Sequence, residues 1–281
     1  MRTRATLAAV SVLTGALALS TLAAPAAQAA DSGTPYTLDV SFSNFKIATA
    51  IKVGTTNVVS TKVTYTLTHG SDVDITSDDF YTDPFLYRGT FGDDSTPELY
   101  DDDFATCTAT SSTTATCTGS IDIHPADGDL KNAYAGTWKA AAEATDFNGQ
   151  DPSSGSLDLS KVGYKDQGDL GSTLVQRYSK LTANAGPEPV YKGRTITTTG
   201  KLSRANWEDH QYHGYTNQPV KLQFRKAGTS TYTTIKTVYS DSYGNVKATA
   251  TAQYDGYWRL SYAGSTTTPA VSATGDYVDV R

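Results

Sequence analysis

Two short segments of the chain concentrate oxygen-bearing side chains, which are the ligands that calcium prefers in proteins. The first, SDVDITSDDF, carries Asp72, Asp74, Thr76 and Asp78 at alternate positions, and in an extended segment alternate side chains point to the same side. The second, ATDFNGQD, has the composition of an oxygen-rich turn. Neither has the glycine and terminal glutamate of an EF-hand loop, so a polar strand or helix cap and an ordinary hairpin turn are the respective alternatives. The candidate metal ligands are Asp72, Asp74, Asp78, Asp146, Asn148 and Asp151.

A third segment, NWEDHQYHGY, concentrates aromatic side chains that could stack on sugar rings. Its candidate ligand-binding residues are Trp207, Tyr212 and Tyr215, and we expect Trp207 to be exposed. His210 and His213 could chelate zinc at this spacing, but no pattern supplies a third ligand. An exposed polar loop is the alternative interpretation.

Catalytic motifs are not evident in the sequence. There is no G-x-S-x-G nucleophile elbow, and no histidine lies in a recognisable catalytic motif. Glutamates are few, and the runs Asp93-Asp94 and Asp101-Asp102-Asp103 lie in low-complexity loops typical of a solvated surface. We therefore predict no catalytic residues and a non-enzymatic protein.

Cys107 and Cys117, the two cysteines of the chain, lie in the near-symmetric stretch ATCTATSSTTATCT. An even pair this close in an exported chain predicts a disulfide that joins the strands of a hairpin. Such a bridge stabilises the fold by roughly 2–3 kcal/mol on the loop-entropy model. A redox-active pair is the alternative, but catalytic pairs usually have the C-x-x-C spacing.

The first 29 residues have the features of a secretory signal peptide. Arg2 and Arg4 precede an uncharged apolar run, and Ala27-Gln28-Ala29 provides a small-x-small cleavage site. An uncleaved membrane anchor is the alternative, since the run is nearly long enough to span a bilayer. We predict cleavage after Ala29, secretion, and no membrane insertion after the signal is removed.

The remaining chain alternates apolar and polar residues with a period of two, which predicts β-strands. In the C-terminal half, the apolar residues that point to one face are Val220, Leu222, Phe224, Trp258 and Leu260. The residues that alternate with them, among them Lys221, Arg225 and Arg259, point to the opposite face. Lys226-Ala227-Gly228, Ser242 to Asn245 and Asp255-Gly256 supply turns between strands. About seven strands in about 100 residues are typical of an Ig-like sandwich.

The N-terminal half shows a looser form of the same pattern. We interpret GTWKAAAEAT as a strand with Trp138 inward, although alanine, glutamate and lysine favour helices. The acidic, aromatic stretch from Tyr81 to Asp103 is expected to form a long loop or an insertion.

Charge differs sharply between the two halves. Residues 31–178 hold 22 acids and 9 bases, a net of −13, whereas residues 179–281 hold 7 acids and 12 bases, a net of +5. We therefore predict an all-β protein with two Ig-like β-sandwich domains in tandem, 30–176 and 177–281, after a signal peptide of residues 1–29.

The stretches SKLTANAGPEPVYKGRTITTTGKLSRANW, PVKLQFRKAGTSTYTTIKTV, DGYWRLSYAG and TPAVSATGDYVDVR resemble an Ig-like module of secreted actinobacterial proteins. The resemblance covers nearly all of the C-terminal domain, and in the N-terminal domain it rests on the cysteine hairpin and on GTW. It implies a sandwich fold and export but no catalytic residues, and some members of the family are described as calcium-binding.

We expect a secreted, non-enzymatic structural, adhesive or binding module at or near the cell envelope. A calcium-dependent or carbohydrate-binding extracellular protein is the alternative, with calcium as the candidate cofactor. Envelope polysaccharide or protein is the candidate partner. Nucleic acid is not expected, because the chain without its signal peptide carries a net charge of −8, from 29 acids and 21 bases.

Overall fold

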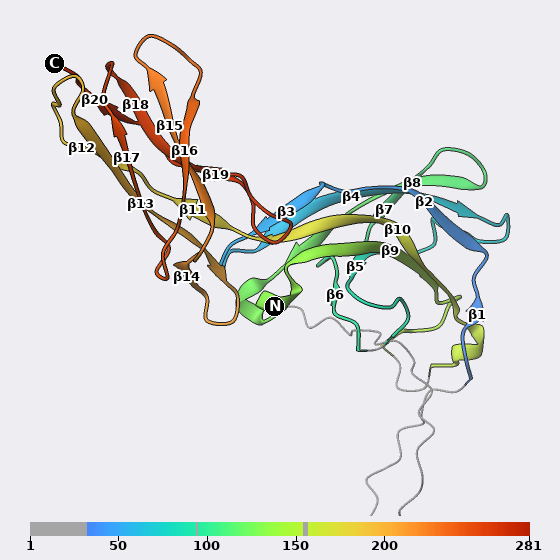
Figure 1. Cartoon of the computed structure of the whole chain (residues 1–281). Coiled ribbons are helices and arrows are strands. Elements are labelled where there is room, and N and C mark those ends of the chain that lie inside the picture. Colours follow the sequence, from blue (N-terminus) through green and yellow to red (C-terminus); the bar gives the residue numbers. More distant parts are fainter. Residues whose placement is uncertain (1–32, 94, 154–156) are drawn as a thin grey trace, which may run out of the picture. The chain divides into compact units, whose positions relative to one another are not determined.

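The computed structural model describes residues 33–93, 95–153 and 157–281 (Figure 1). The predicted signal peptide and its cleavage site lie outside the described residues. Within them the protein is all-β, apart from three single-turn 3₁₀ helices, η1 (Pro125–Asp127), η2 (Asn132–Tyr134) and η3 (Leu159–Lys161). A search of the same residues finds no helix with the length and apolarity to span a membrane.

Two sheets form the N-terminal sandwich. One has the order β1-β10-β9-β5-β6, with β3 also paired to β10, and the other has the order β2-β4-β8-β7. The strands of the first are β1 (Tyr36–Thr37), β3 (Ala50–Val53), β5 (Phe80–Tyr87), β6 (Glu98–Leu99), β9 (Gly136–Asp146) and β10 (Gly163–Arg177). Those of the second are β2 (Val40–Lys46), β4 (Val59–His69), β7 (Thr106–Ala109) and β8 (Thr114–Ile123).

Two further sheets form the C-terminal Ig-like sandwich. In one, β13 pairs with β11, β12, β14 and β17, and the other has the order β16-β15-β18-β19 with β20 also paired to β18. The strands of the first are β11 (Ser179–Leu181), β12 (Asn184–Gly186), β13 (Thr195–Asn206), β14 (Gln211–Gly214) and β17 (Asn245–Thr251). Those of the second are β15 (Pro219–Lys226), β16 (Thr233–Tyr239), β18 (Gly256–Tyr262), β19 (Val271–Ser272) and β20 (Asp276–Val278).

The contacts between residues define two compact units. The first holds the described residues up to 46, with Val63–Ser120 and Lys139–Gly171. The second holds Ile47–Lys62, Ile121–Trp138 and Ser172–Arg281. The division falls inside strands β4, β8, β9 and β10. A boundary between residues 176 and 177 stays a prediction from the sequence.

Strand β9 is the GTWKAAAEAT segment, and the prediction of a strand there is confirmed. Trp138, Ala140, Ala142 and Ala144 are all buried, as the alternation indicates. Ala141 is also buried because Phe85 and Tyr87 of β5 pack against it. Small residues on both faces of β9 thus let side chains pack on either side of the sheet.

The prediction that the stretch from Tyr81 to Asp103 is an irregular loop or insertion was wrong for its first third. Phe80–Tyr87 is strand β5, paired along its whole length with β9. Pro84 obscures this strand in the sequence, since proline lacks an N–H for the ladder. On the side of β5 that faces β6, only Leu86 and Tyr87 are paired. Pro84 has no paired β6 residue next to it.

The C-terminal core follows the predicted alternation. Val220, Leu222, Trp258 and Leu260 are buried from one sheet, and they pack in one cluster with Ile196 and Val246 of the other. Gly228 and Gly244 have φ values of 78° and 80°, which glycine adopts without strain. The predicted turns there are confirmed.

Candidate functional site

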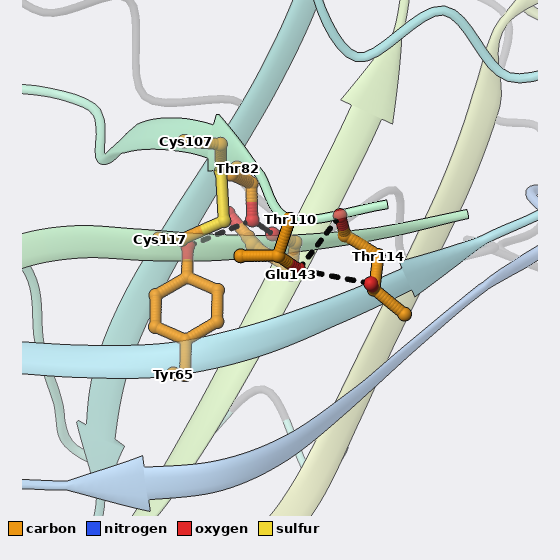
Figure 2. The surroundings of a disulfide bond; sticks show 7 residues. All are labelled: Tyr65, Thr82, Cys107, Thr110, Thr114, Cys117 and Glu143. Atoms are coloured by element: carbon orange, nitrogen blue, oxygen red, sulfur yellow. Dashed lines mark hydrogen bonds between the residues drawn. A yellow bond between two sulfur atoms is a disulfide. The ribbon is translucent and has the colours of Figure 1, made fainter. Parts of the chain in front are cut away.

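Cys107 and Cys117 form the predicted disulfide (Figure 2). They lie directly opposite each other in the antiparallel pair β7–β8. Beyond them, the hydroxyl groups of Thr110, Ser111 and Thr114 hydrogen-bond within the exposed tip. The bridge is therefore a structural staple of a polar hairpin.

A buried polar chain crosses the core behind this hairpin (Figure 2). The Tyr65 hydroxyl lies 2.9 Å from Thr82 Oγ1, which donates to the Glu143 carbonyl at 2.7 Å. Burial raises the pKa of Tyr65 above its ordinary value. The phenol therefore stays protonated and serves as a structural hydrogen-bonding group that links the two sheets.

The first predicted calcium segment is a series of turns and not the extended segment that the alternation requires. Asp74 accepts hydrogen bonds from the backbone and hydroxyl of Thr76, at 2.9 and 2.6 Å. The Thr76 hydroxyl is the main reason that the pKa of Asp74 lies below its ordinary value. Asp72 and Asp78 are exposed in the same turns.

The second predicted segment is also organised by local hydrogen bonds. Asp146 ends β9 and accepts from Asn148 N at 3.0 Å. Asn148, at φ 47°, donates to the Tyr36 hydroxyl and to the Lys161 carbonyl. Asp151 accepts from Ser153, whose hydroxyl lowers the pKa of the carboxyl.

No group of three or more His, Cys, Asp or Glu side chains in the described part of the chain is arranged to hold a metal ion. Backbone carbonyls and water can complete calcium sites. Calcium binding at either segment therefore stays a prediction.

The prediction that Trp207 is exposed was wrong, since its side chain is only 1% exposed. Its indole N–H points to the Val53 carbonyl at 3.3 Å, and its backbone N–H donates to Asn132 Oδ1. These partners are far along the chain, so no local pattern indicates them. Tyr212 lies under Lys180 and Tyr215 under Arg204, with cation-to-ring distances of 3.6 and 3.9 Å. The three aromatic residues do not form one exposed platform.

Another surface of the C-terminal domain gathers arginine and tyrosine side chains. The outward positions of β15 and β18 place Arg225 opposite Tyr257, Gln223 opposite Arg259, and Lys221 opposite Ser261. Tyr277 of β20 continues the row beyond Tyr257. We call this surface the arginine–tyrosine face; it comprises Lys221, Arg225, Tyr232, Tyr257, Arg259 and Tyr277.

Two of the three cations of this face, Arg225 and Arg259, lie against aromatic rings. The Arg225 guanidinium lies 4.0 Å from the Tyr257 centroid, and that of Arg259 lies 3.8 Å from the Tyr232 centroid. Each contact is worth about 0.5–1 kcal/mol at an exposed site. A Cβ on Gly275 would collide with the Tyr232 hydroxyl, so this glycine lets Tyr232 extend across the sheet.

Hydrogen bonds fix both guanidinium groups and leave them without a carboxylate. Arg259 Nε donates to Gln223 Oε1 at 2.8 Å, and Arg225 donates to the Thr229 carbonyl at 2.6 Å. Among the residues that the structure describes, Lys221, Arg225 and Arg259 form no ion pair. Oriented, unneutralised guanidinium groups of this kind can bind anions.

Sequence reasoning placed Lys221, Arg225 and Arg259 outward but did not identify the face. The available signal was the alternation of cations and aromatic residues at outward positions of two strands. The register that makes them neighbours appears only in the structure.

No family model matches the chain, and no curated protein matches it. Among solved structures, the chain is similar to the Yersinia pseudotuberculosis adhesin InvE at 12% identity and a TM-score of 0.27, covering 84% of this chain and 58% of that one. It is also similar to the D0-D1 domain of intimin, at 16% identity, a TM-score of 0.27, and coverage of 85% and 98%. The third similarity is to domains A168-A170 of titin, at 7% identity, a TM-score of 0.25, and coverage of 82% and 60%. The chain spans less than two thirds of the InvE chain. Similarities this low do not bear on function.

Proposed function

We propose that the protein is a secreted, non-enzymatic adhesive or structural module of the cell envelope, and that it binds through the arginine–tyrosine face. The observation that carries this proposal is an outward sheet surface with three cations, each partly or fully exposed, and no neutralising carboxylate in its paired rows. A disulfide is typical of proteins that work outside the cytoplasm. The signal peptide predicted from the sequence and the resemblance to secreted actinobacterial modules support the same location.

A non-enzymatic role is supported by what the candidate residues do. Asp74, Asp146 and Asp151 accept hydrogen bonds in turns. Tyr65 is a buried structural phenol. The arginine–tyrosine face offers cations and hydrogen-bond donors for binding, and both of its guanidinium groups are held by hydrogen bonds to neighbouring groups.

The proposal is tested by cosedimentation of the chain without its signal peptide, residues 30–281, with actinobacterial cell envelopes. We expect saturable binding that weakens as salt concentration rises, since salt screens charge contacts. A protein of similar net charge, such as ovalbumin, is the control for non-specific retention. Retention no greater than that of the control would contradict the proposed function.

A further inference from the structure

We infer that the arginine–tyrosine face binds a linear polysaccharide that carries carboxylate groups. The inference rests on the proposed function, and it names the ligand class of the same surface. Its basis is the order in which charge, hydroxyl groups and rings lie across strands β15, β18 and β20.

The three cations form a zigzag line along the sheet. Arg225 is opposite Tyr257 and Arg259 is opposite Gln223, so Arg225 and Arg259 are diagonal neighbours. Lys221, opposite Ser261, is the diagonal neighbour of Arg259 on the other side. Diagonal neighbours in an antiparallel pair lie about 7–8 Å apart. The backbone positions that carry the three cations therefore follow one another about every 7–8 Å, and such a row of cationic side chains suits a linear polymer with repeated negative charges.

Hydroxyl and amide groups lie between these cations. One row across the sheet holds Thr237, Lys221, Ser261 and Ser272, and the next holds Thr234, Gln223 and Arg259. The two serine hydroxyls are 2.9 Å apart. Such groups both donate and accept hydrogen bonds. They complement the hydroxyl groups of sugar rings that separate successive carboxylates.

The tyrosines supply the remaining contact that a sugar chain uses. Tyr277 is 41% exposed at the end of the row that begins with Arg225 and Tyr257, and its ring meets that of Tyr257 edge to face at 5.2 Å. An exposed phenol offers an apolar ring and a polar hydroxyl together. This arrangement suits the mixed apolar and polar surface of a pyranose.

The same rows offer a protein partner little aliphatic surface. Stable protein interfaces have an apolar core, and the paired outward positions described above carry no aliphatic side chain. An acidic protein or a second copy of this chain would match the charge but would find no aliphatic side chain at these paired positions; the exposed aliphatic side chain beside them is Ile235, at the bulge of β16. A hydrophilic polyanion needs none.

The experiment measures binding of residues 30–281 to oligogalacturonate by calorimetry, with the methyl-esterified oligomer as the uncharged control. We expect binding to oligogalacturonate and at least about tenfold weaker binding to the ester, which corresponds to about 1.4 kcal/mol. R225Q/R259Q should weaken oligogalacturonate binding at least about tenfold. R225K/R259K, which keeps both charges but loses the planar fork of arginine, should weaken it about threefold or more.

The matched control is K201Q/K247Q, which removes two cations from exposed positions of β13 and β17 in the other sheet. It makes the same change in net charge and should alter the dissociation constant by less than about twofold. Near-ultraviolet circular dichroism checks that each variant is folded. Loss of binding in a folded R225Q/R259Q variant but not in the control would support the inference.

Other results would overturn it. Equal binding of poly-glutamate or oligothymidylate would show that the face recognises charge without sugar. Self-association that R225Q/R259Q abolishes would show that a second copy occupies the face. Envelope binding that R225Q/R259Q abolishes, without any binding to oligogalacturonate, would overturn the inference while the proposed function stands. Envelope binding that is unchanged in R225Q/R259Q would contradict both. No envelope binding at all would contradict both.

Discussion

The hydroxyl of Tyr164 donates a 2.8 Å hydrogen bond to the carboxylate of Glu143. Glu143 is largely removed from water, and burial is the main reason that its pKa lies above the ordinary value. The hydrogen bond from Tyr164 opposes the rise, whereas the negative charges of Glu98 and Asp166 add to it. Folding therefore favours the protonated carboxyl.

This relationship predicts the pH dependence of Glu143→Gln. Between the ordinary pKa of about 4.3 and the raised value, the folded state holds more protons than the unfolded state. The protonated Glu143 carboxyl therefore makes its full contribution to the free energy of unfolding below about pH 4. The wild type loses this contribution as pH rises through that window. Glutamine is neutral throughout and keeps an acceptor for Tyr164. The melting temperature of the variant minus that of the wild type should therefore increase as pH is raised from about 4 to about 7.

Asp169→Asn is the control, because folding lowers the pKa of Asp169 whereas it raises the pKa of Glu143. Hydrogen bonds from Lys139 and Tyr87 lower the pKa of Asp169. The ionised Asp169 contributes to stability above its ordinary pKa, and this contribution is lost as pH falls. The difference in stability between the wild type and Asp169→Asn should therefore shrink in acid. A Glu143→Gln profile parallel to wild type would contradict the assignment.

Removal of the disulfide should destabilise the protein without unfolding it. Cys107→Ser/Cys117→Ser is expected to lower the free energy of unfolding by roughly 2–3 kcal/mol, because the reduced chain gains loop entropy when unfolded. Urea denaturation measures the change. Thr108→Ser/Thr116→Ser, a change on the same two strands, should cost less than about 1 kcal/mol. Non-reducing mass spectrometry that finds two free thiols in the exported protein would contradict the prediction.

Trp258 is a core residue whose indole nitrogen has no hydrogen-bond partner in the described part of the chain. Trp258→Ala should cost about 3–5 kcal/mol, since it leaves a cavity next to Phe224. Trp258→Phe should cost far less, because it also removes a buried, unsatisfied N–H. Urea unfolding of both variants checks the pair. A cost below about 1 kcal/mol for the alanine variant would show that the strand phase is wrong.

Alternation predicted the C-terminal sandwich well because each strand has one buried face and one solvated face. The same pattern that placed Trp258 inward placed Arg259 outward, and both are found so. Trp207 lies in a turn after β13, where the inward and outward alternation of a strand does not apply. Its burial depends on Val53 and Asn132. Long-range partners of this kind cannot be found from local sequence.

Strand β5 and the arginine–tyrosine face show a second limit of prediction from the sequence, which is that the pairing and register of strands are not visible in it. Phe80–Tyr87 contains Asp83 and Pro84, so its composition indicates a loop, yet pairing with β9 makes it a strand. Tertiary pairing overrides propensity there. For Arg225 and Arg259, the outward placement could be predicted from the alternation, whereas their diagonal arrangement required the register between β15 and β18.

Calcium binding at the Asp72–Asp78 or Asp146–Asp151 segment is tested by melting residues 30–281 in about 5 mM calcium chloride and in sodium chloride of equal ionic strength. A site with a dissociation constant near 10⁻⁴–10⁻³ M should gain about 1.4 kcal/mol at ten times that concentration. The expected rise in melting temperature is roughly 3–6 °C. Asp74→Asn and Asp146→Asn then assign the loop by abolishing the rise. Equal melting temperatures in the two salts would contradict calcium binding and leave the acidic segments as a solubilising surface.

Gly168 of β10 provides a test of the aromatic packing over the first sheet. A Cβ at this position would lie 2.6 Å from the Phe91 ring, and Phe91 packs edge to face on Tyr87 at 5.2 Å. Gly168→Ala should therefore displace Phe91 and cost about 1–3 kcal/mol, as overpacking does. Gly54→Ala, where a Cβ meets only the Tyr212 hydroxyl at 3.4 Å, is the matched control and should cost less than about 1 kcal/mol. If Gly168→Ala costs little in the Phe91→Ala background, the cost of the added methyl arises from this ring. Equal costs for Gly168→Ala with and without Phe91 would show that the strain lies in the β10 backbone instead.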